Sequence, residues 1–184
     1  PEALGEFPTA CLAEEMDTPG EGQIRALITV AGNPVLSAPN SDRLAAALAG
    51  LEAMICVDAY LNETTRHAHV ILPPPSPLER SHYDLSFYQL STRNIAHYSL
   101  PVFARAPGQP DEWEILLRLM GAVAGRYRET PIAALDEAVA RQLITAEAHS
   151  EGSPVAGRDV EELLAALEPR RGPERLLDFM LRVG

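Results

Sequence analysis

Short apolar runs alternate with amphipathic segments over the first half of the chain. Residues 24–30 and 53–57 are largely apolar runs rich in β-branched side chains, and they predict strands that are buried on both faces of a sheet. Between them, residues 40–51 carry leucines at helical spacing behind a polar start that can cap the first turn. Residues 62–68 predict a short helical turn, and residues 69–72 a third strand. The predicted order is therefore β-α-β-α-β.

Strands that alternate with helices at this spacing predict a parallel sheet with right-handed crossovers. Helices on both faces would make it a three-layer, open, Rossmann-like α/β sheet. Residues 76–103 predict irregular structure with one strand near 94–98, and later helices are predicted at 111–124, 131–148 and 159–167, with a break at 168–173. We therefore divide the chain into a lead segment (1–22), the α/β domain (23–125) and a helical C-terminal extension (126–184).

Composition and charge narrow the classes of function. The 184 residues are 46% apolar, which is typical of a globular protein with a sizeable core. A net charge of -11 disfavours contact with nucleic acid or an anionic membrane surface, and no apolar stretch approaches the length of a membrane span. The only cysteines are Cys11 and Cys56, which favours a reducing cytoplasm.

The predicted strands are followed by residues that permit unusual backbone angles or that carry polar side chains. In an open parallel sheet the ligand lies beyond the carboxyl ends of the strands, so these residues are the candidate contact surface. The negative net charge favours a neutral ligand there, or one that is bound locally by backbone dipoles. The predicted binding residues are Gly32, Asn33, Pro34, Asp58, Asn62, Glu63, Thr64 and Pro73.

Each group in this set suits one part of a nucleotide. Gly32 permits close approach of the backbone to a phosphate, and Asn33 tolerates left-handed geometry while offering an amide. Asp58 can accept a hydrogen bond from a ribose hydroxyl or a guanine N–H, and residues 62–64 begin a helical turn whose free N–H groups favour an anion. The same residues also fit an ordinary turn, a helix cap and a strand end. Because no Gly-x-Gly-x-x-Gly fingerprint is present, the pattern leaves both interpretations open.

No catalytic residue and no metal ligand is predicted in this chain. Ser81, His82 and Asp84 are neighbours in sequence, but a catalytic triad requires spatial order and an oxyanion site, and no Gly-x-Ser-x-Gly elbow occurs. His67 and His69 have the spacing of a metal pair, yet alternate residues entering a strand point in different directions and no third ligand is close in sequence.

The stretch "AGNPVLSAPNSDRLAAALAGLEAMICVDAYLNETTRHAHVILP" (31–73) resembles a segment of the molybdopterin oxidoreductase family, which includes formate dehydrogenases and nitrate reductases. Residues 108–121 resemble a later helix of that family. Residues 79–94 depart from the family's pattern. Asn62 and His69 are allowed by that pattern, although Thr and Asp are commoner at these positions. The matching positions are Asn33, Pro34, Ser37, Pro39, Asn40, Arg43, Asp58, Asn62, Glu63, Thr64, Ala68, Leu72 and Pro73.

The resemblance implies a domain of a larger enzyme that binds a guanine-nucleotide arm of the bis(molybdopterin guanine dinucleotide) cofactor, with molybdenum or tungsten. By position, Gly32 and Asn33 would meet the diphosphate or nucleoside, and Asp58 with Asn62 the guanosine. The metal ligand and an iron-sulfur cluster would belong to other segments of the parent enzyme, so the isolated segment is expected to be inactive. Formate, nitrate and other substrates stay open. The alternative is a non-catalytic accessory module that binds a nucleotide or a partner protein.

Overall fold

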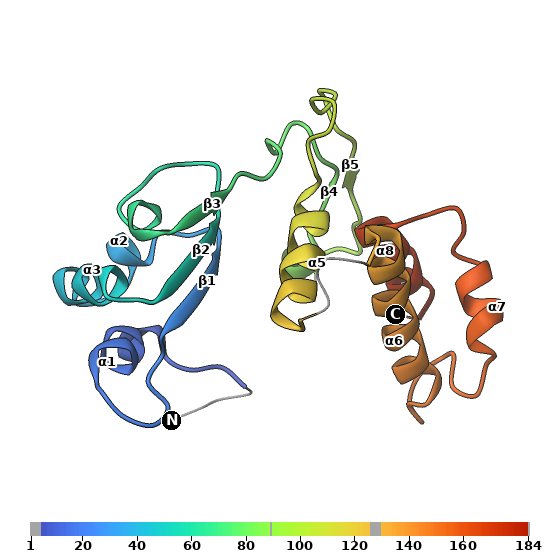
Figure 1. The fold of residues 1–184 in the computed structure, drawn as a ribbon. Helices are drawn as coiled ribbons and strands as arrows, with labels where there is room; N and C mark the ends of the chain where they lie inside the picture. Colours follow the sequence, from blue (N-terminus) through green and yellow to red (C-terminus); the bar gives the residue numbers. More distant parts are fainter. Residues whose placement is uncertain (1–4, 89, 126–129, 184) are drawn as a thin grey trace. The chain divides into compact units, whose positions relative to one another are not determined.

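A computed structural model describes residues 5–88, 90–125 and 130–183, and the chain divides into two compact units, Pro1–Gln109 and Pro110–Gly184 (Figure 1). The first contains a parallel sheet, and the second is helical. Among the helices of the described residues, none has the length and apolar character needed to cross a membrane.

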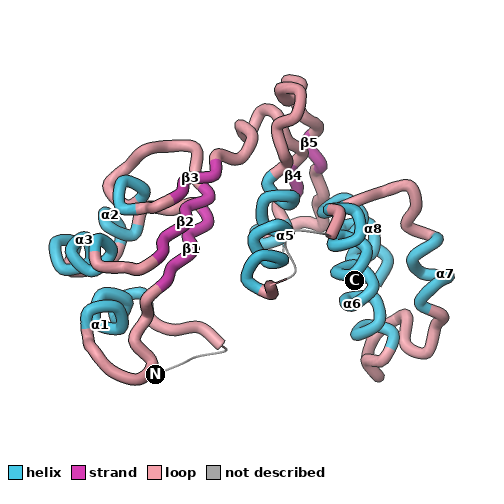
Figure 2. Tube along the Cα trace, in the orientation of Figure 1, coloured by secondary structure: helices cyan, strands magenta, loops and turns pink. Residues whose placement is uncertain are grey.

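The first unit is built on a three-stranded parallel sheet, shown in magenta in Figure 2. Its strands are β1 (Ala26–Val30), β2 (Ala53–Val57) and β3 (Val70–Leu72), in the spatial order β1-β2-β3. The connections hold α2 (Pro34–Ser37), α3 (Ser41–Ala49) and the 3-10 turn η2 (Thr65–His67). The predicted α/β class and the parallel sheet are therefore confirmed.

One face of this sheet packs against helices. The lead segment forms η1 (Thr9–Cys11) and α1 (Leu12–Asp17), and α1 contacts α3. The core between these helices and the sheet includes the fully buried Leu44, Leu48, Met54 and Cys56. Hydrophobic burial on this face is the main favourable term in the stability of the unit.

The other face of the sheet is largely bare, so the prediction of strands buried on both faces is wrong for this unit. Ile28, Val30 and Val70 are 43%, 49% and 46% exposed, and Figure 1 shows α1, α2 and α3 on a single side of the sheet. The strand order explains the difference. The chain crosses from β1 to β2 to β3 in one direction, and right-handed crossovers in one direction place both connections on the same face.

The segment after the sheet holds a small antiparallel pair, β4 (His82–Tyr83) and β5 (Tyr98–Ser99), with α4 (Leu85–Tyr88) between them. The rings of Tyr83 and Tyr88 meet edge to face with centroids 5.0 Å apart. The Tyr88 hydroxyl donates to the His97 carbonyl oxygen and accepts from the His97 N–H. The sequence predicts one strand near 94–98, of which only Tyr98 lies in β5, and it does not predict β4.

The second unit consists of α5 (Glu112–Val123), α6 (Ile132–Ala148), α7 (Val160–Ala165) and α8 (Gly172–Val183). Its core includes Ile144, Leu167 and Phe179. The helix α5 contacts α6 and α8, and the chain divides into its two units after Gln109. α8 begins inside the predicted break at 168–173 and was not predicted.

Candidate functional site

The carboxyl ends of the three strands meet at one edge of the sheet. Val30 is in register with Val57, and Val57 with Leu72, so the residues that follow each strand emerge together. The Ala31 N–H donates to the Val57 carbonyl oxygen at 2.9 Å, which continues the pairing one residue past β1. The edge thus lies where the sequence analysis placed the candidate contact surface.

The turn after β1 has an unusual backbone. Ala31 and Gly32 both have positive φ, 55° and 81°. This region suits glycine and is strained for alanine, and such outliers concentrate at functional sites. A Cβ atom added at Gly32 would have no heavy atom within 4 Å apart from its chain neighbours, so the turn is open on that side. Pro34 follows as the first residue of α2.

Asn33, Glu63 and Thr64 form one hydrogen-bonded group across the turns after β1 and β2. The Asn33 Nδ2 donates to Glu63 Oε2 at 2.7 Å, and the Thr64 hydroxyl donates to Asn33 Oδ1 at 2.7 Å. The Thr64 hydroxyl also accepts from the Val35 N–H at 3.0 Å. Because Thr64 is fully buried, its hydroxyl serves to join the two turns.

Asp58 and Asn62 form a second group in the loop after β2. Asp58 Oδ1 accepts from the Tyr60 N–H at 2.9 Å, and Oδ2 accepts from Asn62 Nδ2 at 3.3 Å. Asn62 Oδ1 accepts from the N–H groups of Thr64 and Thr65, both at 2.9 Å. A carboxylate has about four acceptor sites, so Asp58 keeps capacity for further donors after these two bonds.

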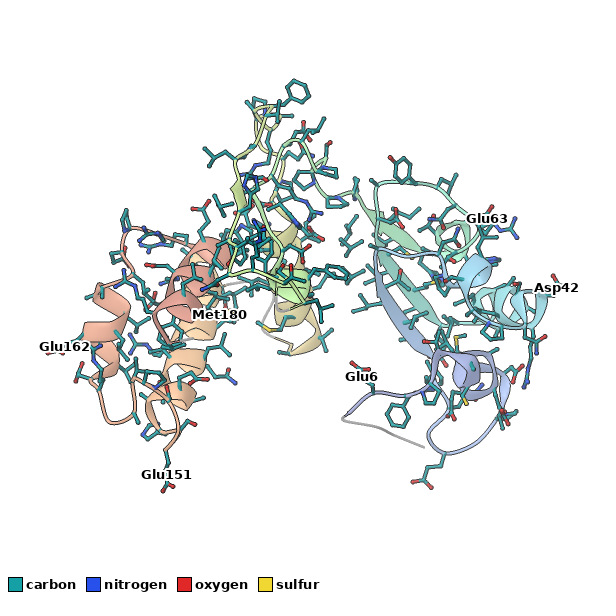
Figure 3. The ribbon with its side chains drawn as sticks, turned by 180° about the vertical axis from the view of Figure 1, so that it is seen from behind. Glu6, Asp42, Glu63, Glu151, Glu162 and Met180 are labelled. Atoms are coloured by element: carbon teal, nitrogen blue, oxygen red, sulfur yellow. The ribbon has the colours of Figure 1, made fainter. Side chains whose placement is uncertain are left out.

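The charged side chains near this edge include the carboxylates of Asp58 and Glu63 and the guanidinium of Arg66, which also favours the ionised form of Glu63. The hydrogen bond from Asn33 holds the pKa of the Glu63 carboxyl below its usual value, so Glu63 is ionised at neutral pH. Figure 3 shows the exposed Glu63 side chain at the surface of this unit. Ionised carboxylates attract N–H and O–H donors and repel phosphate. The arrangement therefore suits the base or the ribose of a nucleotide better than its phosphates near Asp58 and Glu63.

The predicted residues are thus brought to one edge, with differing freedom to meet a ligand. The Asn62 side chain bonds within its own loop and the Thr64 hydroxyl bonds to the turn after β1, whereas Gly32 retains an open side and Asp58 retains acceptor capacity. Pro73 directly follows β3 and is exposed. The His69 ring accepts the Met54 N–H on Nδ1 at 3.1 Å, which ties it to the start of β2. Within the described residues, no cluster of side chains could hold a metal ion.

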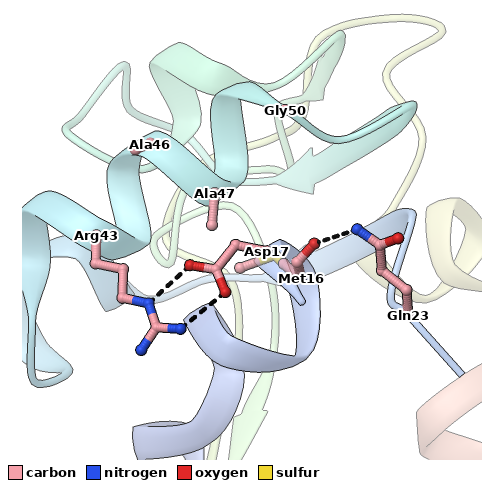
Figure 4. A pocket seen from close by; sticks show the side chains of 7 residues that line it. All are labelled: Met16, Asp17, Gln23, Arg43, Ala46, Ala47 and Gly50. Carbon is pink, nitrogen blue, oxygen red and sulfur yellow. Dashed lines mark hydrogen bonds and ion pairs between the residues drawn. The ribbon is translucent and has the colours of Figure 1, made fainter. Parts of the chain in front are cut away.

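A separate pocket of about 320 Å³ lies on α1 and α3, away from the strand ends (Figure 4). Arg43 lines it and forms a bidentate ion pair with Asp17 at 2.7 and 2.8 Å. This pair holds the lead helix against α3, which gives Arg43 a structural role. The remaining lining residues are Met16, Gln23, Ala46, Ala47 and Gly50.

Sequence reasoning missed three large apolar side chains beside the candidate site. Leu36 follows β1 in α2, and Tyr60 and Leu61 follow β2; they are 66%, 75% and 78% exposed. Periodicity carries no signal for them because they stand outside any regular apolar stripe. Their exposure in the very loops that carry the polar groups is the feature that identifies them.

The profile of the family described as molybdopterin oxidoreductase matches residues 2–119, well over half of the chain. The assimilatory nitrate reductase catalytic subunit of Bacillus subtilis is 30% identical over 62% of this chain. The NADPH-Fe(3+) oxidoreductase subunit alpha of Geobacter sulfurreducens is 29% identical over 65%, and the nitrate reductase of Symbiobacterium thermophilum 31% over 53%. The matches span only 16%, 14% and 12% of these relatives. No solved structure gives a significant match.

Proposed function

This chain belongs to the molybdopterin oxidoreductase family, and we propose that it holds a guanine-nucleotide arm of the molybdenum cofactor within a larger oxidoreductase. The observation that carries the proposal is the position of Asp58, whose carboxylate stands beyond the carboxyl end of β2 with unused acceptor capacity. Guanine presents two adjacent N–H donors on one edge, and a carboxylate matches them. The cofactor is the bis(molybdopterin guanine dinucleotide) form, with molybdenum or tungsten.

Different residues at this edge would contact different parts of the nucleotide. Asp58, held by Asn62, would accept from the guanine N–H edge. The diphosphate would lie against the open turn at Gly32, where a glycine lets the backbone approach closely and the φ of 81° excludes most side chains. Asn33, Glu63 and Thr64 would keep the two turns in register, and Pro34 and Pro73 would stiffen their exits.

The metal supplies the two-electron oxidation or reduction when the complete cofactor is bound, and this chain supplies binding and orientation. We assign no catalytic residue to it and expect the isolated 184 residues to turn over neither nitrate nor formate. An iron-sulfur cluster and the metal ligand belong to other parts of the parent enzyme. The chain covers 16% or less of its relatives, so the remaining domains of that parent are its main partners. Two free cysteines fit a reducing cytoplasm.

We further propose that the sheet is part of a three-layer, Rossmann-like sheet in the parent enzyme. In the described residues, β1 pairs on one edge only, and Ile28, Val30 and Val70 leave an apolar face uncovered. Parallel sheets are normally covered on both faces. A strand added beside β1, followed by right-handed crossovers in the opposite direction, would cover the bare face. It would also create a reversal of strand order beside the turn at Gly32, where such sheets bind ligands.

Gly32→Val tests the role of the turn, with Gly22→Val as a matched control. Both glycines have positive φ, 81° and 87°, and neither has an atom within 4 Å of an added Cβ, so the two substitutions cost similar strain. Only Gly32→Val adds a side chain where the diphosphate is proposed to lie. In NMR titrations of the chain with GDP, we expect Gly32→Val to lose most of the affinity and Gly22→Val to keep it. Equal affinities in the two variants would make the turn purely structural.

A further inference from the structure

Tyr60 combines a fixed backbone with a free aromatic ring. Its N–H donates to Asp58 Oδ1 at 2.9 Å, and its carbonyl oxygen accepts from the Thr65 hydroxyl at 2.9 Å. Thr65 is fully buried, and its hydroxyl also accepts from the Asn62 N–H at 2.8 Å. The main chain is therefore clamped on both sides of a ring that is 75% exposed.

The fixed backbone holds the exposed Tyr60 ring where it can contact a bound molecule. A tyrosine buries a large apolar surface when it packs, and within this unit Tyr60 leaves most of that surface in water. The loop needs no aromatic side chain for its own hydrogen bonds, since those come from the Tyr60 backbone, Asp58 and Thr65. The neighbouring Leu61 and Leu36 are also exposed, so the polar groups of the edge have an apolar surround. Small-molecule sites commonly combine such a surround with a few placed polar groups.

We propose that the Tyr60 ring stacks on the base of the bound nucleotide while Asp58 accepts hydrogen bonds from its edge. This inference rests on the proposed function, because it takes a nucleotide at the strand ends as given. A carboxylate that accepts hydrogen bonds from the edge of a base lies in the plane of that base. A ring that stacks on the base lies above or below this plane. One hydrogen-bonded turn that carries both groups two residues apart can supply the two contacts together. Leu36 and Leu61 would border the base without selecting it.

The two residues are expected to act differently on affinity. Stacking tolerates any base because every base has a π-face, whereas a carboxylate selects guanine over adenine, which lacks the paired N–H donors. Loss of the Tyr60 ring should therefore weaken GDP and ADP by the same factor. Loss of the Asp58 charge should weaken GDP alone.

The test is an NMR titration of the full 184-residue chain with GDP and with ADP. Tyr60→Ala should weaken both nucleotides roughly 5- to 150-fold, in keeping with alanine substitutions at stacking sites. Tyr60→Phe keeps the ring and should bind like the unsubstituted chain. Phe7→Ala removes an aromatic side chain of similar exposure, 71%, in the lead segment and serves as the matched control.

The outcomes separate this inference from the proposed function. If Tyr60→Ala binds GDP as tightly as Phe7→Ala while Asp58→Asn loses affinity, stacking is refuted and the nucleotide site stands. If Tyr60→Phe is as weak as Tyr60→Ala, the hydroxyl acts instead of the ring face and stacking is again refuted. If the unsubstituted chain, with the dispersed amide signals of a folded protein, binds neither nucleotide, both proposals are overturned. The inference is supported only if Tyr60→Ala lowers the affinities for GDP and ADP by the same factor.

Discussion

The two units of this chain use their polar side chains in opposite ways. In the helical unit, Arg175 and Asp136 are buried together, and Arg175 Nη2 donates to Asp136 Oδ2 at 2.5 Å. Asp136 Oδ1 also accepts the Gly172 N–H at 3.1 Å, and Arg175 Nη1 donates to Glu137 Oε2 at 2.6 Å. These groups join α6 to the start of α8, and Asp136 and Arg175 are shut away from water.

In the sheet unit the polar residues gather at a surface edge instead. Asn33, Asn62 and Thr64 fix the loops, and Asp58 keeps acceptor capacity at that edge. The sheet also leaves one apolar face open. The comparison indicates that Asp136 and Arg175 of the helical unit bond to each other away from water, whereas Asp58 of the sheet unit keeps acceptor capacity for other groups.

The largest expected effect comes from breaking the buried ion pair. Arg175→Met leaves Asp136 buried without its cation, and removal of one partner of such a pair typically costs about 3–5 kcal/mol of unfolding free energy. Denaturant unfolding followed by the fluorescence of Trp113, the chain's single tryptophan and a residue of α5, reports on this unit. Arg182→Met removes an exposed partner of Asp178 and is the control, with a cost of about 1 kcal/mol or less. Equal costs for the two variants would contradict the stabilising role of the buried pair.

The two faces of the sheet should differ in their sensitivity to truncation. Leu48→Ala opens a cavity in the covered core and is expected to cost about 2–5 kcal/mol. Val30→Ala on the bare face should cost about 1 kcal/mol or less, because half of the side chain already contacts water. Amide hydrogen exchange of β1 and β2 measures both. In the parent enzyme the Val30→Ala cost should rise if another layer covers this face, and an unchanged cost would argue against that layer.

A smaller effect is expected from the ion pair between the lead helix and α3. The hydrogen bonds from Arg43 lower the pKa of the Asp17 carboxyl below its model-peptide value of 3.8. The folded state thus favours the ionised form, so the contribution is fully present above pH 3.8 and is lost as pH falls through the lower folded-state pKa. Asp17→Asn should flatten this part of the acid unfolding curve. An identical curve for the variant would show that the pair contributes nothing to stability.

The sequence predicted the order of the sheet elements well because that order rests on local patterns. Apolar runs at 24–30 and 53–57 became β1 and β2, and the family resemblance on residues 31–73 is confirmed by the profile match. The bare face could not be predicted from apolar runs alone, because which face is covered depends on the order in which strands pair. The same limit applies to Arg175 and Asp136, which lie 39 residues apart.

The predicted site shows the same division between local and non-local information. The strand ends were placed correctly by their Gly and Asp residues, because turns after strands follow from local chemistry. The hydrogen bond from the Thr64 hydroxyl to Asn33, 31 residues away, has no signal in the local sequence. Tyr60 is not predicted from the sequence because an isolated aromatic residue in a loop has no periodicity, and the proposal for its ring depends on backbone bonds and exposure that only the structure gives.

The central claim is that Asp58 reads guanine at the strand ends, and the most direct test is the GDP-to-ADP affinity ratio of the chain and of Asp58→Asn. We expect the unsubstituted chain to prefer GDP, and the variant to lose about 1.5–3 kcal/mol of GDP binding, as for the loss of a charged hydrogen-bond partner, with ADP unchanged. Asp42→Asn, an exposed acid in the first turn of α3, is the control and should keep the preference. A chain that binds GDP and ADP equally, or an Asp58→Asn variant that retains the guanine preference, would contradict the account.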